Sequence, residues 1–178
     1  MRPLSVFAIS LWCVVVGFMA SGQVYAQSPC LNYAAISLEP SLPSIQAGAY
    51  FQLAGRVTYK GTSTAKITLF GPIFNNSGKP IPRWNSFTMF YQDSDGTGNT
   101  ASVGASLGYL DPAGNVKNVA LLDSNQHFPS GTGVREMSTL FTHTFDFVNN
   151  YYYIQVGLNR TTTTSAPAIL GIKICEAP

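Results

Sequence analysis

The sequence predicts an all-β domain: an antiparallel β-sandwich of jelly-roll or immunoglobulin-like type with about nine strands. Apolar residues recur at every second position in several segments, and no stretch shows sustained helical spacing. Turn residues separate these segments at regular intervals. Two cysteines, Cys30 and Cys175, lie near the two ends of the predicted domain, so a bridge between them would place its first and last strands side by side.

Each predicted strand is a short run of alternating residues. The runs cover residues 33–38, 51–59, 66–70, 87–92, 100–109, 116–122, 141–147, 151–159 and 169–175. In 100–109 the apolar residues alternate with serine and glycine, as in Ser102, Gly104 and Ser106. Such a face offers almost no side-chain cover, so another sheet, another subunit or a ligand must approach it closely.

Turn chemistry connects the strands. Residues 111–115, Asp-Pro-Ala-Gly-Asn, combine a proline preset for a turn with a glycine suited to positive φ, and they predict a hairpin. Asn149 and Asn150 predict a second hairpin between two aromatic strands. We expect 71–83 and 123–136 to be long irregular loops. No internal repeat or linker is evident, so residues 27–178 are predicted to form one domain.

Residues 1–26 are predicted to be a cleaved signal peptide. Arg2 precedes an apolar run over 4–18, and Val24-Tyr25-Ala26 offers small residues at the cleavage positions before Gln27. A transmembrane anchor is the alternative, but the apolar run is shorter than the ~20 residues that a bilayer requires. Cleavage predicts a secreted or periplasmic protein without membrane insertion.

Removal of Cys13 with this segment leaves only Cys30 and Cys175. Two lone cysteines in an oxidising compartment usually form a disulfide, and two free thiols are the alternative. After residue 26 the chain has nine basic and eight acidic side chains and no basic cluster, which argues against nucleic acid as a partner.

Catalytic motifs are weak. Residues 104–108 fit the G-x-S-x-G pattern, but that motif needs a strand-to-helix turn, and here the alternation continues through Ser106 until the 111–115 turn. No catalytic residue is assigned. A small secreted hydrolase stays as a third hypothesis, with His127, Asp123 and Glu136 in one loop. His143 lies on the apolar side of its segment, as expected of a hydrogen-bonded core imidazole.

The segment 93–99 resembles the beginning of a calcium loop. Asp93 and Asp95 at alternate positions, a glycine turn and Asn99 provide the oxygens that calcium prefers, although a full EF-hand pattern is missing. The same residues are ordinary in a hairpin loop. Calcium is the one cofactor that the sequence suggests.

Aromatic residues provide the candidate ligand site. Tyr151, Tyr153, Gln155 and Asn159 share one face of a predicted strand, and Trp84 precedes a second aromatic segment. An exposed strip of rings and amides can bind sugars; the alternatives are a homo-oligomer interface and ordinary packing. The favoured hypothesis is therefore an exported, non-catalytic module that binds a glycan or protein ligand. The second hypothesis is a self-assembling structural or surface subunit.

Overall fold

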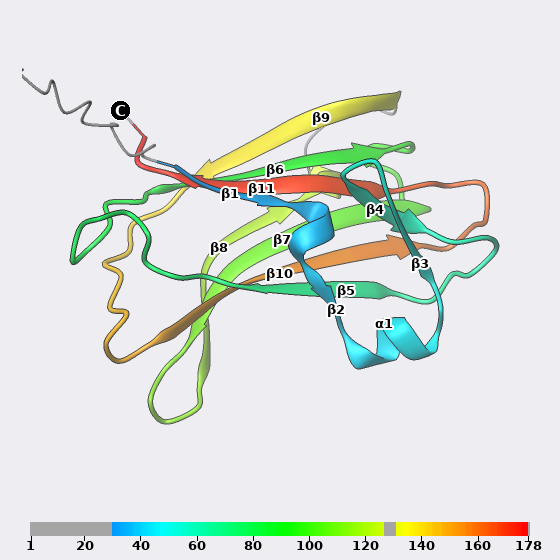
Figure 1. The fold of residues 1–178 in the computed structure, drawn as a ribbon. Helices are drawn as coiled ribbons and strands as arrows, with labels where there is room; N and C mark the ends of the chain where they lie inside the picture. The colour runs from blue at the N-terminus through cyan, green and yellow to red at the C-terminus, as the bar shows by residue number, and fades with distance from the viewer. Residues whose placement is uncertain (1–29, 127–130, 178) are drawn as a thin grey trace, which may run out of the picture.

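The computed structural model describes residues 30–126 and 131–177, in which eleven strands form two antiparallel sheets packed face to face (Figure 1). The strands are β1 (Cys30–Ala34), β2 (Glu39–Pro40), β3 (Tyr50–Leu53), β4 (Arg56–Tyr59), β5 (Ile67–Pro72), β6 (Ser86–Asp93), β7 (Ala101–Leu110), β8 (Val116–Asp123), β9 (Gly131–Leu140), β10 (Tyr151–Arg160) and β11 (Ala168–Cys175). One short α-helix, α1 (Leu42–Gln46), begins after the N-cap Ser41, and two 3-10 helical turns cover Ala35–Ser37 and Ser124–Gln126. The predicted signal peptide lies outside the described residues. Within them, no helix has the length and apolar character needed to cross a membrane.

The strand order is that of a jelly roll. One sheet has six strands in the order β3-β4-β11-β6-β9, with β1 paired to β11, and the other has five in the order β2-β5-β10-β7-β8. Taken from β4 to β11, the eight strands pair as 4-11-6-9 and 5-10-7-8, which is a double Greek key. The predicted antiparallel sandwich is therefore confirmed, and of the two types expected it is the jelly roll.

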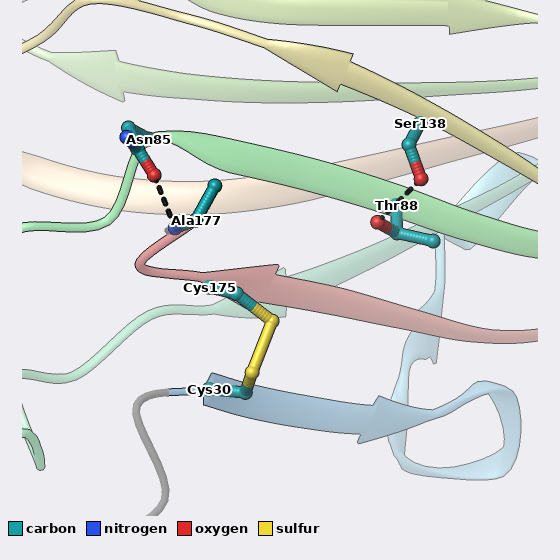
Figure 2. The surroundings of a disulfide bond; sticks show 6 residues. All are labelled: Cys30, Asn85, Thr88, Ser138, Cys175 and Ala177. Atoms are coloured by element: carbon teal, nitrogen blue, oxygen red, sulfur yellow. Dashed lines mark hydrogen bonds between the residues drawn. A yellow bond between two sulfur atoms is a disulfide. The ribbon is translucent and has the colours of Figure 1, made fainter.

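The disulfide joins the first and last strands, as predicted. Cys30 and Cys175 are register partners in the β1–β11 pair, with their Cα atoms 4.1 Å apart, and Figure 2 shows the bridge between the strand ends. Just beyond it, the Ala177 N–H donates to Asn85 Oδ1 at 2.6 Å, which ties the chain after β11 to the start of β6.

The hydrophobic core lies between the sheets. Alternate residues of the central strands point inward, as Ile154, Val156 and Leu158 do from β10 and Val103 and Leu107 do from β7, and all five are fully buried. The opposite residues of β7 and β10 point outward, so the same alternation builds both the core and an outer surface.

The predicted strand 51–59 is instead a hairpin. Ala54 and Gly55 both have positive φ, 50° and 81°, and they turn the chain between β3 and β4. Phe51 pairs with Thr58 and is half exposed, whereas Val57 is buried. The single alternating face expected across this segment is therefore wrong, because the turn places the two halves in different strands.

Two further expectations about the strands are corrected. Residues 141–145 keep an alternation of more and less buried side chains, but the segment 141–147 belongs to no strand and ends in a turn. The Asn149-Asn150 turn consequently joins no hairpin, and β10 pairs with β5 and β7 instead. Part of the expected loop 123–136 belongs to edge strand β9, where Met137 is buried while Val134 and Leu140 are exposed. The 111–115 hairpin is confirmed between β7 and β8.

Candidate functional site

The outer face of the five-stranded sheet carries a trough with a volume of about 440 Å³. It runs over β10, β7 and β8, which lie side by side in Figure 1. The lining residues are Lys66, Ser102, Gly104, Ala105, Ser106, Asn118, Leu121, Leu122, Asp123, Gln126, Gln155, Gly157 and Asn159.

Small residues in register form the floor of the trough. Gly104 on β7 is the register partner of Gly157 on β10, and in the neighbouring row Ser106 is the partner of Gln155. A Cβ atom at Gly104 would lie 3.5 Å from the Leu122 carbonyl oxygen, which is an ordinary contact. Gly104 therefore leaves the backbone of β7 bare, without a steric reason inside the sheet that forbids a side chain there, whereas the space at Gly157 borders the Lys66 side chain, whose Cε would lie 3.5 Å from a Cβ atom at that position.

The polar side chains around this floor are largely free to bind a ligand. Asn159 Nδ2 donates to Ser102 Oγ at 3.2 Å. Within the described parts of the chain, the side chains of Ser106, Gln155 and Asn118 have no hydrogen-bond partner. These groups supply both donors and acceptors, as a hydroxyl-rich ligand requires.

Tyr153 lies at one end of the trough. The next outward position on β7 after Ser106 is Gly108, where a Cβ atom would lie 3.1 Å from both Cζ and Oη of Tyr153. The ring therefore lies across Gly108 and separates the trough from an apolar row beyond it. That row consists of the register partners Tyr151, Leu110 and Val116, which are 77%, 37% and 62% exposed.

Four of the five predicted ligand residues share this face, and one does not. Tyr151, Tyr153, Gln155 and Asn159 all point outward from β10. Trp84 is only 4% exposed and packs edge-on against Phe145, with ring centroids 5.3 Å apart. It belongs to the core, because the segment 141–147 covers it. No sequence pattern indicates the walls provided by Lys66, Asn118 and Leu121, because the position of these residues depends on which strands are neighbours.

The predicted calcium residues Asp93 and Asp95 lie close to each other, at the end of the sandwich that is opposite the disulfide. Asp93 is fully buried, and its Oδ2 accepts a hydrogen bond from Ser124 Oγ at 2.5 Å. Asp95 Oδ2 accepts hydrogen bonds from the N–H and hydroxyl of Thr100, both at 2.6 Å, and from the Ala101 N–H at 3.1 Å. Asp95 Oδ1 is buried without a hydrogen-bond partner in the described residues.

This environment separates the two pKa values. Burial raises the pKa of Asp93 to about 6, and the neighbouring Asp95 carboxylate contributes to the rise. For Asp95, burial alone would raise the pKa, but the hydrogen bonds from Thr100 outweigh it and lower the pKa below 3.8. Asn99 is exposed. No group of three or more His, Cys, Asp or Glu placed to hold a metal occurs in the part of the chain that the structure describes.

The G-x-S-x-G segment lies inside strand β7, and its pairing with β8 shifts register between Leu107 and Gly108. Ser106 lies in the middle of β7, paired with Gln155 on one side and Leu121 on the other, and not on a strand-to-helix turn. His143 Nε2 lies 2.9 Å from the Tyr152 hydroxyl, and burial lowers the pKa of this imidazole. His127, the other histidine, lies outside the described residues.

Comparison with known proteins gives structural similarities only. Neither a protein-family model nor a curated protein matches the sequence. The chain is similar to the CBM36-1 domain of a multidomain xylanase from the hindgut metagenome of Trinervitermes trinervoides, with a TM-score of 0.46, 13% identity and coverage of 84% of this chain and 98% of that domain. It is also similar to the xylan-binding module CBM15, with a TM-score of 0.44, 13% identity and coverage of 85% and 93%. A third similar structure is a CBM36 in complex with calcium and xylotriose, with a TM-score of 0.43, 13% identity and coverage of 81% and 98%. These TM-scores lie below 0.5, and the ligand of the present chain is therefore inferred from its own residues.

Proposed function

We propose that this protein is a non-catalytic glycan-binding module whose ligand lies in the trough over β10, β7 and β8. The observation that carries the proposal is the floor of the trough, which is bare at Gly104 and covered only by the aliphatic part of Lys66 at Gly157, and which is bordered by amide and hydroxyl side chains without protein partners. A sugar ring can approach such a floor closely, and its hydroxyls can exchange hydrogen bonds with Ser106, Gln155 and Asn118.

The aromatic residues support the same proposal. Tyr153 presents a ring at the end of the trough, and Tyr151 lies largely exposed in the next row. Sugar rings have apolar C–H faces that pack on aromatic rings, while the tyrosine hydroxyl offers a polar contact. An elongated oligosaccharide can therefore contact the trough through hydrogen bonds and Tyr153 through stacking.

Filling the floor tests the proposal most directly. Gly104→Thr places a β-branched side chain on the floor without a backbone clash, and threonine is favourable in a strand. Gly133→Thr on β9 is the matched control, because a Cβ atom there contacts nothing within 4 Å and the residue belongs to the other sheet.

On an array of oligosaccharides followed by calorimetry, we expect wild type and Gly133→Thr to bind the same glycan. Gly104→Thr and Tyr153→Ala should each weaken that binding by about tenfold, or ~1.4 kcal/mol. If wild type binds no glycan, or if Gly104→Thr binds as tightly as wild type, the trough is not a glycan site.

Self-assembly is a second candidate function, favoured by the exposed apolar row of Tyr151, Leu110 and Val116. Tyrosine and apolar residues are enriched at subunit interfaces. Light scattering of the mature protein distinguishes the two, since a stable oligomer that Val116→Glu dissociates supports assembly, and a monomer excludes it.

The compartment and calcium remain proposals. Mass spectrometry of the exported protein should give a chain that begins at Gln27 if Val24-Tyr25-Ala26 is the cleavage site.

Two carboxylates in contact need a proton or a cation between them, so calcium bound at Asp93 and Asp95 should raise the unfolding temperature relative to protein in chelator. An unchanged temperature favours the proton.

A further inference from the structure

We infer that the trough selects glycans that contain a uronic acid, with Lys66 as the residue that binds the carboxylate. This inference rests on the proposed glycan-binding function and specifies the class of sugar. Lys66 and Asp123 are the two charged residues in the trough lining, and Lys66 is the cation.

Lys66 lies over the Gly157 part of the trough floor. It directly precedes β5, and a Cβ atom at Gly157 on the neighbouring strand would lie 3.5 Å from Lys66 Cε. The aliphatic part of the lysine therefore extends over Gly157, and the missing side chain there is what makes room for it. The ammonium group is consequently placed at the trough and not directed away from the sheet.

The ammonium group has no acidic partner of its own. The one ion pair among the described residues joins Lys79 to Glu176, so it does not involve Lys66. Lys66 Nζ also has no hydrogen bond there. A lysine ammonium has three donors and forms strong hydrogen bonds with a carboxylate, which is the anionic group that a uronic acid carries.

Asp123 sets the orientation of the sugar. It is the register partner of Gly104, two strand spacings from Gly157, or about 10 Å across the sheet. Its Oδ1 accepts a hydrogen bond from the Asn125 N–H at 3.1 Å, and the carboxylate can accept further bonds from sugar hydroxyls while it repels an acid. A uronate ring between these residues would direct its carboxylate toward Lys66 and its hydroxyls toward Asp123.

The test uses matched pairs of sugars. Tetramers of mannuronate, guluronate, galacturonate and glucuronate are each compared with their carboxyl-reduced neutral counterparts by calorimetry at low and high salt. We expect wild type to bind at least one uronate tetramer about tenfold more tightly than its neutral counterpart, because a hydrogen bond to a charged group is worth more than a neutral one. The preference should shrink as salt screens the exposed charge.

Three variants identify the residue responsible. Lys66→Met keeps the aliphatic length but removes the charge, and it should bind both sugars of a pair equally. Lys66→Arg should keep the preference. Lys60→Met, an exposed lysine after β4, removes the same net charge outside the trough and should also keep it.

The outcomes separate this inference from the function on which it rests. Tighter or equal binding of the neutral sugars by wild type, or a preference that survives in Lys66→Met, overturns the selection of uronic acids and leaves glycan binding standing. If no sugar of either kind binds, both proposals fail together.

Discussion

The two ends of the sandwich are closed in opposite ways. At the end that holds the disulfide, an aromatic cluster fills the space between the sheets, with Trp84, Phe145, Phe147 and Tyr152 in contact and His143 beside them. At the other end, buried polar groups fill the space between the sheets. There the Asp93–Asp95 pair and the side chain of Arg160 are held mainly by backbone groups and hydroxyls.

At the polar end, one chain of hydrogen bonds connects residues of two loops. Thr100 donates to Asp95, and its Oγ1 also lies 3.0 Å from Ser165 Oγ. The Ser165 carbonyl in turn accepts a hydrogen bond from Arg160 Nη1 at 3.1 Å. Acid and base are therefore connected through neutral groups and not by a direct ion pair. The aromatic end depends mainly on buried ring area and responds to pH through His143, whereas the polar end depends on the protonation of Asp93 and on hydrogen bonds without substitutes.

The largest expected effect is at the aromatic end. Trp84→Ala removes a buried ring that contacts Phe145 and Phe147, and it should lower the free energy of unfolding by about 4 kcal/mol. Urea unfolding measures this loss. Trp84→Phe keeps an aromatic ring and should cost clearly less. A loss below ~1 kcal/mol for the alanine variant would show that this end is not closed by ring packing.

The next largest effect is at the polar end. Arg160 is 6% exposed, and its guanidinium donates to the backbone carbonyls of Gly61, Ser63, Thr163 and Ser165 while it stacks on Tyr59. Arg160→Met preserves most of the packing but leaves these carbonyls without their donor, and it should cost about 3 kcal/mol. Arg160→Lys restores the charge but not the planar fork, so its stability should fall between the two.

If Arg160→Met were as stable as wild type in urea unfolding, the carbonyls would have found other partners. The polar end would then be closed by apolar packing after all, and the contrast between the two ends would disappear.

Sequence patterns predicted what depends on neighbouring residues. The alternation in β7 and β10 correctly separated core from outer surface, and Asp111 with Gly114 correctly marked the hairpin. The disulfide was predicted from the number of cysteines, because only two are left after residue 26. In each case the signal lies within one segment or follows from a count, so no knowledge of strand order is needed.

The parts that depend on non-local pairing could not be predicted. Ser102 and Asn159 contact each other across 57 residues of sequence, and Lys66 reaches the trough only because β10 lies between β5 and β7. The burial of Trp84 could not be predicted for a related reason. A residue just before a strand has no alternation to show its face, and its burial is decided by the segment 141–147 that covers it. Edge strand β9 could not be predicted, because a single buried residue such as Met137 does not produce an alternating pattern of apolar side chains.

The smallest expected effect is a pH dependence specific to the polar end. In the folded protein the pKa of Asp93 is raised to about 6 from 3.8, because its carboxyl group is buried. The folded state therefore holds this proton more tightly than the unfolded state does. The resulting stability is fully present below pH 3.8 and is lost as the pH rises through 6. Between pH 5 and pH 7.5 the loss should be about 1 kcal/mol.

Asp93→Asn isolates this contribution. The amide resembles the protonated acid in shape and can donate to Asp95 Oδ1, so the variant should lack the Asp93 share of the pH dependence. His143 acts in the opposite direction: burial lowers its pKa in the folded state, so its neutral form is favoured and stability rises with pH. The measurement is therefore the difference in unfolding free energy between wild type and Asp93→Asn at each pH, from which the histidine contribution cancels. That difference should shift in favour of the variant as the pH rises from 5 to 7.5. A difference that stays constant over this range would mean that Asp93 does not titrate between pH 5 and pH 7.5, and that this carboxyl gives the polar end no pH dependence there.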